Sequence, residues 1–146
     1  MIAAVLEGER LATWTRFLKA HSAITRRLER DLAVAHGLTL SGYDVLIQLM
    51  HAPGQRLRPV ELAKAVVLTR SGITRLVQGL ERSGHVERTE CPDDARGFLV
   101  ALTPAGLELV RRARGTHLEG VAELFTDRYS DEELEALAGL LDRLPS

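Results

Sequence analysis

One short stretch limits the fold more than any other part of the chain, because its apolar side chains keep strict helical spacing. Ile73, Leu76, Val77 and Leu80 fall at positions i, i+3, i+4 and i+7 of residues 70–82, which predicts a helix with a narrow buried stripe. Gly84 follows and is typical of a helix end. We therefore expect a short amphipathic helix over 70–82 that is preceded by an N-cap at Thr69.

Two short runs with strand character come directly after this predicted helix. They are HVERTEC at 85–91 and FLVALT at 98–103, and both are bounded by turn-forming residues. The segment between them, PDDARG, supplies Pro92 and Gly97 as turn formers. The pair predicts a β-hairpin with a charged tip.

The chain before this unit has the periodicity of helices. A stripe of apolar residues at spacings of three and four predicts a long helix over about 9–35, which ends at Gly37. A second helix is expected to begin at Ser41, where Asp44 three residues on makes a variant of the capping box. The turn Pro53-Gly54 ends that helix.

Three further helices complete the predicted order. Pro59 suits the first position of a short helix that precedes residues 70–82. After the hairpin, Thr103-Pro104 begins a helix of about 25 residues, and the capping box from Ser130 to Glu133 begins the last one.

A tight helical pair followed at once by a two-stranded hairpin is a winged helix-turn-helix. We expect a mainly α fold with a small β-hairpin wing, and a helical dimerisation region joined to it. The terminal helices are too long and too apolar for a small domain, so we expect them to pack against a second copy of the chain. The predicted division is a winged helix-turn-helix domain at 37–103, with the dimerisation region formed by 1–36 and 104–146.

Composition restricts the class of protein further. The chain has 146 residues, 45% hydrophobic and 27% charged, which fits one globular domain and excludes wholesale disorder. No apolar run approaches the roughly 20 residues that cross a bilayer, and Glu7 and Glu9 lie where a signal peptide would be apolar. The single cysteine, Cys91, excludes an internal disulfide framework. We expect a cytoplasmic protein with no membrane partner.

The net charge of −1 hides a gradient along the chain. Residues 54–85 contain six basic side chains and two acidic ones, whereas residues 117–146 contain two basic and eight acidic ones. A polyanion could therefore bind only through the middle of the chain. The basic residues are 17 Arg and 2 Lys, a bias that suits phosphate and guanine recognition but is equally explained by a GC-rich coding sequence.

The motifs of common enzymes are missing from the sequence. The histidines at 21, 36, 51, 85 and 117 have neither H-x-x-x-H nor H-E-x-x-H spacing. There is no Gly-rich phosphate loop and no G-x-S-x-G elbow. We expect a protein that is not an enzyme and has neither a metal site nor a cofactor.

The polar face of the predicted helix 70–82 carries side chains that suit DNA recognition. Arg contacts guanine, Gln contacts adenine, and Thr and Ser contact either base or phosphate. A solvated face would usually mix Glu and Lys, but the only acid in this run is Glu81. We expect base contacts from one set of residues: Ser71, Thr74, Arg75 and Gln78. Thr69 and Arg70, at the start of the helix, are expected to contact phosphate.

The predicted hairpin adds a second contact. Arg96 at its tip is expected to enter a narrow minor groove, which attracts Arg at A-tracts, and Asp94 is expected to orient its guanidinium through a salt bridge. The alternative is an ordinary soluble turn. Arg88, on the first strand of the hairpin, is a weaker candidate for a phosphate contact.

Three stretches of the chain resemble the MarR family of transcriptional regulators. They are SGYDVLIQL (41–49), ELAKAVVLTRSGITRLVQGLERSGHVER (61–88) and CPDDARGFLVALTPAG (91–106), which match the second helix, the reading head and the wing of that family. The Asp-x-Arg of the wing is present as Asp94-Ala95-Arg96. Ala95 departs from the second Arg that the family often has, which removes one phosphate contact.

The resemblance implies an obligate homodimer that binds double-stranded DNA. Each subunit would place one recognition helix in a major groove and one wing in the flanking minor groove. Two-fold symmetry then implies a pseudo-palindromic operator with half-sites about 10 bp apart. Binding near a promoter would usually repress transcription, although activation is the other outcome.

Members of this family often lose DNA affinity when a small aromatic or phenolic ligand binds. Candidate ligand contacts are Trp14 and His21 on the first helix, with Tyr43 and Asp44 on the second. The alternative, which we favour for Trp14 and His21, is packing in the dimer core. Protonation of His21 or His117 is a further way to change the dimer geometry.

Cys91 is expected to be chemically inert. The redox sensors of the family that we can match use a cysteine in the first helix, and this chain has none there. Acidic neighbours should raise the pKa of the Cys91 thiol rather than lower it.

A different class of function remains open at this stage. A dimer that has lost DNA binding could serve as a small-molecule-binding or protein-interaction module. The protein-interaction alternative predicts acids or large hydrophobic residues on the polar face of 70–82, and the residues present argue against it. The small-molecule carrier, a separate alternative, would bind a ligand without binding DNA.

Overall fold

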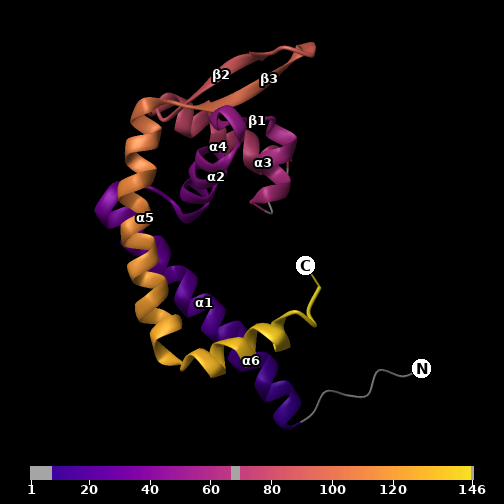
Figure 1. The fold of residues 1–146 in the computed structure, drawn as a ribbon, viewed down its shortest axis with the longest axis vertical. Helices are drawn as coiled ribbons and strands as arrows, with labels where there is room; N and C mark the ends of the chain where they lie inside the picture. The colour runs from indigo at the N-terminus through magenta and orange to yellow at the C-terminus, as the bar shows by residue number, and fades with distance from the viewer. Residues whose placement is uncertain (1–7, 67–69, 146) are drawn as a thin grey trace, which may run out of the picture.

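The computed structural model describes residues 8–66 and 70–145, with the side chains of residues 70 and 71 left out. A group of helices and a small sheet form the upper part of the molecule, and two long helices extend away from it (Figure 1). The elements, in chain order, are α1 (Glu9–His36), α2 (Leu40–His51), η1 (Pro53–Gln55), β1 (Arg56–Leu57), α3 (Pro59–Ala65), α4 (Arg70–Arg82), β2 (Val86–Cys91), β3 (Asp94–Leu102), α5 (Pro104–Leu124), η2 (Thr126–Arg128) and α6 (Asp131–Leu141).

This order confirms the mainly helical fold with a small hairpin wing. The wing, defined as residues 86–102, is the antiparallel pair β2 and β3, in which Val86 lies opposite Leu102 and Arg88 opposite Val100. β3 begins at Asp94 rather than near residue 98, so the turn is tighter than expected. The predicted turn was too long because β3 continues through its polar residues as far as Asp94, which lies opposite Cys91 across an irregularity in the register.

One local expectation was wrong and one element was missed. α2 begins two residues earlier than predicted, with Thr39 rather than Ser41 as its N-cap, because the Thr39 hydroxyl accepts a hydrogen bond from the Gly42 backbone N–H at 2.9 Å. The short strand β1 was not predicted at all. It pairs with β3 and makes the sheet three-stranded, in the order β1-β3-β2.

The core lies beneath α2, where four elements meet. Leu46 of α2, Ile73 of α4, Val100 of β3 and Val110 of α5 have no exposed surface and belong to one continuous apolar cluster. Leu32 brings the end of α1 into the same cluster. This packing fixes α4 by its apolar side and leaves its other side outward.

The junction between α4, the wing and α5 is held by close backbone contacts. Gly84 adopts a left-handed conformation, with φ of 80°, and the His85 N–H donates to the Leu80 carbonyl at 2.9 Å, which ends α4. The Thr103 hydroxyl donates to the Gly84 carbonyl at 2.7 Å and caps α5 by accepting from the Gly106 N–H. The first turn of α5 is therefore tied directly to the end of α4.

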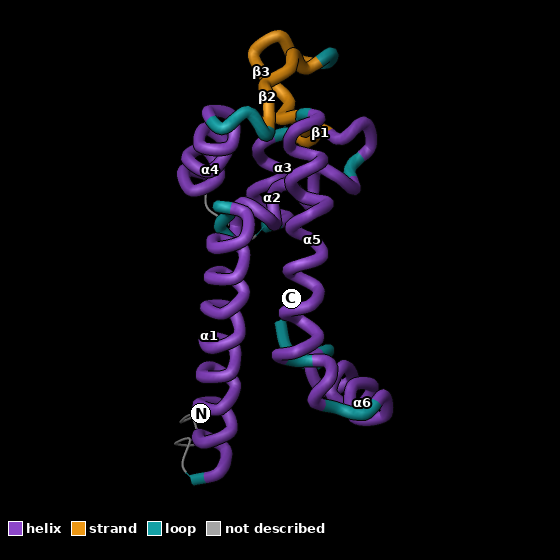
Figure 2. Tube along the Cα trace, turned by 90° about the vertical axis from the view of Figure 1, so that its left-hand side faces the viewer, coloured by secondary structure: helices purple, strands orange, loops and turns teal. Residues whose placement is uncertain are grey.

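The outer half of α1 and all of α6 have little covering. α1 packs against α5, and α6 extends away from the lower end of α5 (Figure 2). No residue of α6 is buried, and Trp14 and Leu140 are 52% and 53% exposed. Large hydrophobic side chains thus lie on the surface of a single chain along both helices.

Among the described residues, no single helix is long and apolar enough to cross a membrane. Only α1 and α2 taken together, bent by 77° at their break, meet that test, on length and composition alone.

Candidate nucleic-acid interface

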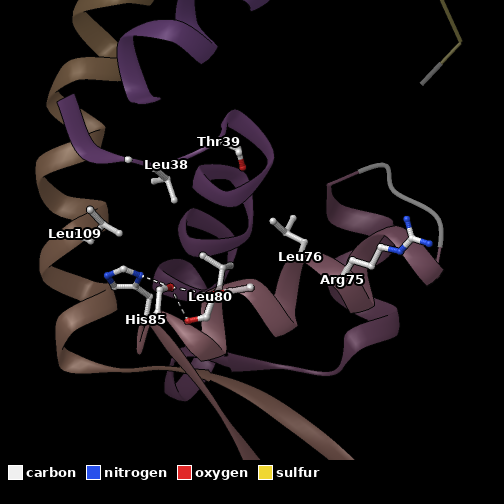
Figure 3. Close-up of a pocket in the computed structure, with 10 residues that line it drawn as sticks. Leu38, Thr39, Arg75, Leu76, Leu80, His85 and Leu109 are labelled. Atoms are coloured by element: carbon white, nitrogen blue, oxygen red, sulfur yellow. Dashed lines mark hydrogen bonds between the residues drawn. The ribbon is translucent and has the colours of Figure 1, made fainter. Parts of the chain in front are cut away.

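The outward side of α4 brings together the side chains that were expected to read bases. Thr74, Arg75 and Gln78 are exposed, whereas Ile73 and Val77 on the opposite side are 0% and 3% exposed. The amphipathic pattern of residues 70–82 is therefore confirmed as a buried stripe and a solvent-facing polar stripe. Arg75 projects outward from α4 in Figure 3.

The start of α4 is only partly described. Thr69, the expected N-cap and phosphate contact, lies outside the described residues. Arg70 and Ser71 belong to α4, but their side chains are also outside the description. Their expected contacts to phosphate and base therefore stay predictions.

The wing tip places Arg96 far from the core, with an exposed side chain. The expected salt bridge from Asp94 to its guanidinium is absent among the described ion pairs. Asp94 Oδ1 instead accepts a hydrogen bond from the Arg96 backbone N–H at 3.0 Å. A short carboxylate two residues before an N–H favours this local turn. Asp94 thus shapes the turn and leaves the Arg96 side chain in solvent.

Gly97 lies close to the same carboxylate. A Cβ at this position would lie 3.1 Å from Asp94 Oδ2, closer than most real Cβ contacts. The carboxylate that accepts from Arg96 therefore occupies the space beside Gly97.

Arg88 was expected to contact phosphate, but its side chain makes contacts within the protein. Its Nε donates to Glu81 Oε2 of α4 at 2.9 Å, and its guanidinium carbon lies 4.6 Å from the centre of the Phe98 ring. The side chain is thus already paired with an acid and stacked on an aromatic ring. No signal in the sequence indicated this contact, because seven residues and a turn separate Glu81 from Arg88.

The four candidate ligand contacts fall into two separate groups. Trp14 and His21 are exposed on the outer half of α1 and are linked through Phe17, with ring centres 5.9 and 6.4 Å apart. Tyr43 is buried and Asp44 is half-buried on α2. Trp14 lies about 33 Å along α1 from His36, the end of α1 that is joined to α2, at 1.5 Å per residue. Within one chain the two groups therefore do not line one pocket.

The group on α2 has unusual electrostatics. The rings of Tyr43 and His117 are 4.5 Å apart, and His117 Nδ1 is buried with no hydrogen-bond partner among the described residues. Burial lowers the pKa of His117 below its usual 6.5, and Asp44 opposes that shift. Burial also raises the pKa of Asp44, while His117 opposes it.

A groove of about 320 Å³ lies between α4, the α1–α2 junction and α5 (Figure 3). Its apolar lining includes Leu38, Leu80 and Leu109, and Ser83 and His85, whose Oγ and Nδ1 are 2.9 Å apart, lie at one end. Gly79 also lines it, and a Cβ there would meet no atom within 4 Å. The groove was not predicted, because its lining comes from segments far apart in the sequence.

Cys91 is buried at the end of β2. The described residues contain no group of three His, Cys, Asp or Glu side chains that could hold a metal ion.

An exposed helix (α4) that packs by its apolar side and is followed directly by a projecting hairpin is the arrangement of a winged helix-turn-helix protein. A model described as the MarR family matches residues 36–97. Sco3205, a MarR family transcriptional regulator from Streptomyces coelicolor solved in complex with DNA, superposes with a TM-score of 0.92 and 32% identity, covering 96% of this chain and 88% of that one. This chain belongs to the MarR family of transcriptional regulators.

Two further similarities agree with this assignment. AbsC, another MarR family regulator from Streptomyces coelicolor, has a TM-score of 0.90 and 30% identity over 95% of this chain and 93% of that one. The HTH-type transcriptional repressor YetL of Bacillus subtilis (strain 168) is 32% identical over 108 residues, 74% of this chain. The match spans 64% of YetL's own length, which is less than two thirds.

Proposed function

We propose that the chain is a homodimeric repressor that binds a pseudo-palindromic operator. The observation that carries this proposal is the polar side of α4, where Thr74, Arg75 and Gln78 are exposed together above a fully apolar packing side. Such side chains in a major groove discriminate between base pairs. The DNA complex of Sco3205 and the repressor name of YetL support the same direction.

We assign the minor-groove contact to Arg96. Its exposed side chain lies at the tip of the wing, at the end of the hairpin away from the buried pair Val86 and Leu102. A guanidinium at such a tip can enter a narrow groove, where the negative potential is strongest. Thr69, Arg70 and Ser71 are proposed to complete the phosphate and base contacts at the start of α4.

The proposed dimer uses the region formed by 1–36 and 104–146, and the domain at 37–103 binds DNA. Its support is the exposed apolar surface of α1 and α6, which a monomeric protein would rarely leave in water. In a two-fold dimer these surfaces cover each other and hold the two α4 helices at a fixed separation. We expect the protein to act in the cytoplasm, without enzymatic activity or a cofactor.

We propose that a small aromatic or phenolic effector weakens DNA binding. Trp14, His21, Tyr43 and Asp44 stay candidates for its contacts, and the groove beside α4 is a further one because Arg75 is among its lining residues. Gly79→Leu would fill this groove, while Trp14→Ala would remove a side chain from the outer half of α1, which also belongs to the proposed dimer surface. If benzoates and phenols still release DNA from both variants, neither place holds the effector.

The other interpretation, a small-molecule or protein-interaction module without DNA binding, has less support. A protein-interaction module requires a face on α4 that would repel phosphate or bury apolar surface, and a small-molecule carrier would bind a ligand without binding DNA. The described polar side carries one acid, Glu81, and that acid is paired with Arg88.

The test is an in-vitro selection of random duplex DNA by the purified protein at near-physiological salt, which suppresses non-specific phosphate binding. We expect enrichment of a pseudo-palindrome with half-sites about one helical turn apart. Folded, dimeric protein that enriches no sequence would contradict the proposal. Repression is tested separately, by transcription from a promoter that contains the selected site.

A further inference from the structure

Arg88 connects the reading helix to the wing at the point where the wing leaves the core. On the inner face of the hairpin, Val86 lies opposite Leu102 and Arg88 opposite Val100. Val86, Val100 and Leu102 are buried, whereas Arg88 is exposed and Phe98 is half-buried. Arg88 and Phe98 are diagonal neighbours across the strands, one step nearer the tip than the buried pair Val86 and Leu102.

The contact from the helix side comes from Glu81, in the last turn of α4. Arg88 Nε and Glu81 Oε2 are 2.9 Å apart, and the two side chains are 41% and 39% exposed. The same guanidinium also lies over the Phe98 ring, with 4.6 Å between the Arg88 Cζ and the ring centre. The guanidinium thus contacts both an acid of α4 and a ring of β3.

Glu81 shares the outward side of α4 with the proposed base-reading residues. Thr74, Gln78 and Glu81 follow one another at i, i+4 and i+7, which places them on one helical face. An acid on this face would repel phosphate, so electrostatics alone would disfavour it near DNA. Glu81 nevertheless forms an ion pair with Arg88 of the wing. A negative charge kept where it disfavours DNA binding points to a role in positioning the wing.

We propose that the Glu81–Arg88–Phe98 cluster is a positioning device that fixes the wing relative to α4. With the angle fixed, the outward side of α4 and Arg96 reach a major groove and the adjacent minor groove at the same time. The inference rests on the proposed function, and it replaces the phosphate contact expected for Arg88. Its effect on DNA binding is exerted through Arg96.

The proposal and simple electrostatics predict opposite signs for one substitution. Glu81→Met keeps an unbranched, helix-favouring side chain, removes the acceptor, and removes one negative charge. If charge alone mattered, affinity for DNA would rise. If the cluster positions the wing, affinity for the selected operator falls about three- to tenfold, the size expected from an exposed ion pair together with a cation–π contact.

Glu87→Met is the matched control. Glu87 is exposed on β2, next to Arg88 but on the other face of the strand, and it forms no ion pair among the described residues. The change in charge is identical. We expect Glu87→Met to bind the operator as tightly as the wild type or more tightly.

The decisive experiment is a double-mutant cycle between Glu81→Met and Arg96→Ala, measured as operator affinity by fluorescence anisotropy. The proposal predicts that Glu81→Met weakens binding in the wild-type background and changes it less than twofold in the Arg96→Ala background. Thermal unfolding of each variant checks that the fold is retained. A merely structural role of Glu81 would not make its effect depend on Arg96.

Three results would overturn the inference. In the first, Glu81→Met tightens binding as Glu87→Met does. In the second, Glu81→Met reduces operator affinity equally in the wild-type and Arg96→Ala backgrounds. In the third, Arg96→Ala alone leaves the affinity unchanged, so that the cluster has nothing to position. Arg75→Ala, measured in parallel, reports on the proposed function independently. A loss with Arg75→Ala alongside any of these results leaves the proposed function standing and rejects the role of the cluster.

Discussion

Arg75 is the single residue on which the proposed base recognition depends most. Its side chain extends from the middle of α4, on the outward side (Figure 3). Replacing it by Ala should cost about 1–3 kcal/mol on the selected operator and relax specificity at one base pair. The measurement is a competition between the operator and its single-base variants.

Arg111→Ala provides the comparison for charge. Arg111 is an exposed cation on α5, so its loss changes the net charge equally without changing the proposed reading surface. If Arg75→Ala and Arg111→Ala weaken the operator and scrambled DNA by the same factors, Arg75 does not read a base.

His117 makes stability depend on pH in a predictable direction. Burial lowers its pKa in the folded protein, so between that value and about 6.5 the unfolded chain binds more protons than the folded one. Stability should therefore fall as the pH is lowered through this window. Asp44 has the opposite slope at lower pH, because its pKa is raised above 3.8.

His117→Gln isolates this effect. The free energy of unfolding, measured between about pH 5 and 8 at one protein concentration, should fall less on acidification in the variant than in the wild type. If both proteins lose the same stability on acidification, the His117 ring does not control the pH dependence of unfolding. Arg114, which lowers the pKa of Tyr43, and Glu29, which raises the pKa of Asp44, are unchanged in both proteins.

At the scale of elements, two helical glycines should respond in opposite directions to the same substitution. A Cβ on Gly106 would lie 2.0 Å from the His85 carbonyl oxygen, where α5 meets the end of α4, whereas a Cβ on Gly79 meets nothing. Gly106→Ala should destabilise the protein by at least about 1–3 kcal/mol, the usual cost of overpacking. Gly79→Ala should stabilise it by roughly 0.5–1 kcal/mol through helix propensity.

Denaturant unfolding curves give the change in free energy of unfolding for each variant, and Gly79→Ala serves as the control for Gly106→Ala. Equal effects of the two substitutions would show that the close approach of α5 to His85 does not constrain the fold. The sequence alone cannot distinguish these glycines, because both lie within helical patterns.

The sequence predicted the elements whose signals are local. The apolar stripe of α4, the Ser130 cap of α6 and the existence of the hairpin follow from spacing and capping residues, and the structure has all three. β1 was missed because two residues form a strand only when β3 is beside them. The start of α2 was misplaced because Thr39 and Ser41 are both good caps, and packing of Leu38 and Tyr43 decides between them.

The same distinction applies to the candidate site. Helical periodicity was sufficient to find the outward side of α4. The Glu81–Arg88–Phe98 cluster depends on how the wing packs against α4, and the groove lined by Leu38, Leu80 and Leu109 depends on how α5 packs there. No local sequence pattern determines this packing.

At the scale of the whole molecule, the exposed apolar side chains of α6 predict the oligomeric state. Leu140→Glu should place a charge in the proposed interface and weaken the dimer by at least about 2 kcal/mol, roughly 30-fold in its dissociation constant. Sedimentation at micromolar concentrations should show a shift toward monomer, together with weaker operator binding.

Val60→Glu is the comparison for this prediction. Val60 is 46% exposed on α3, away from the terminal helices. It should leave the sedimentation profile unchanged. A Leu140→Glu protein that sediments as the wild type does would remove α6 from the interface.

We expect a two-fold dimer of this chain to read two half-sites on one side of the double helix. The most direct test compares its affinity for the selected operator with that for the same operator lengthened by about 5 bp between the half-sites, which rotates one half-site by half a turn. A substituted spacer of unchanged length is the control. We predict that the insertion reduces the affinity close to the non-specific level while the control does not. Equal affinity for the lengthened and original operators would contradict the account.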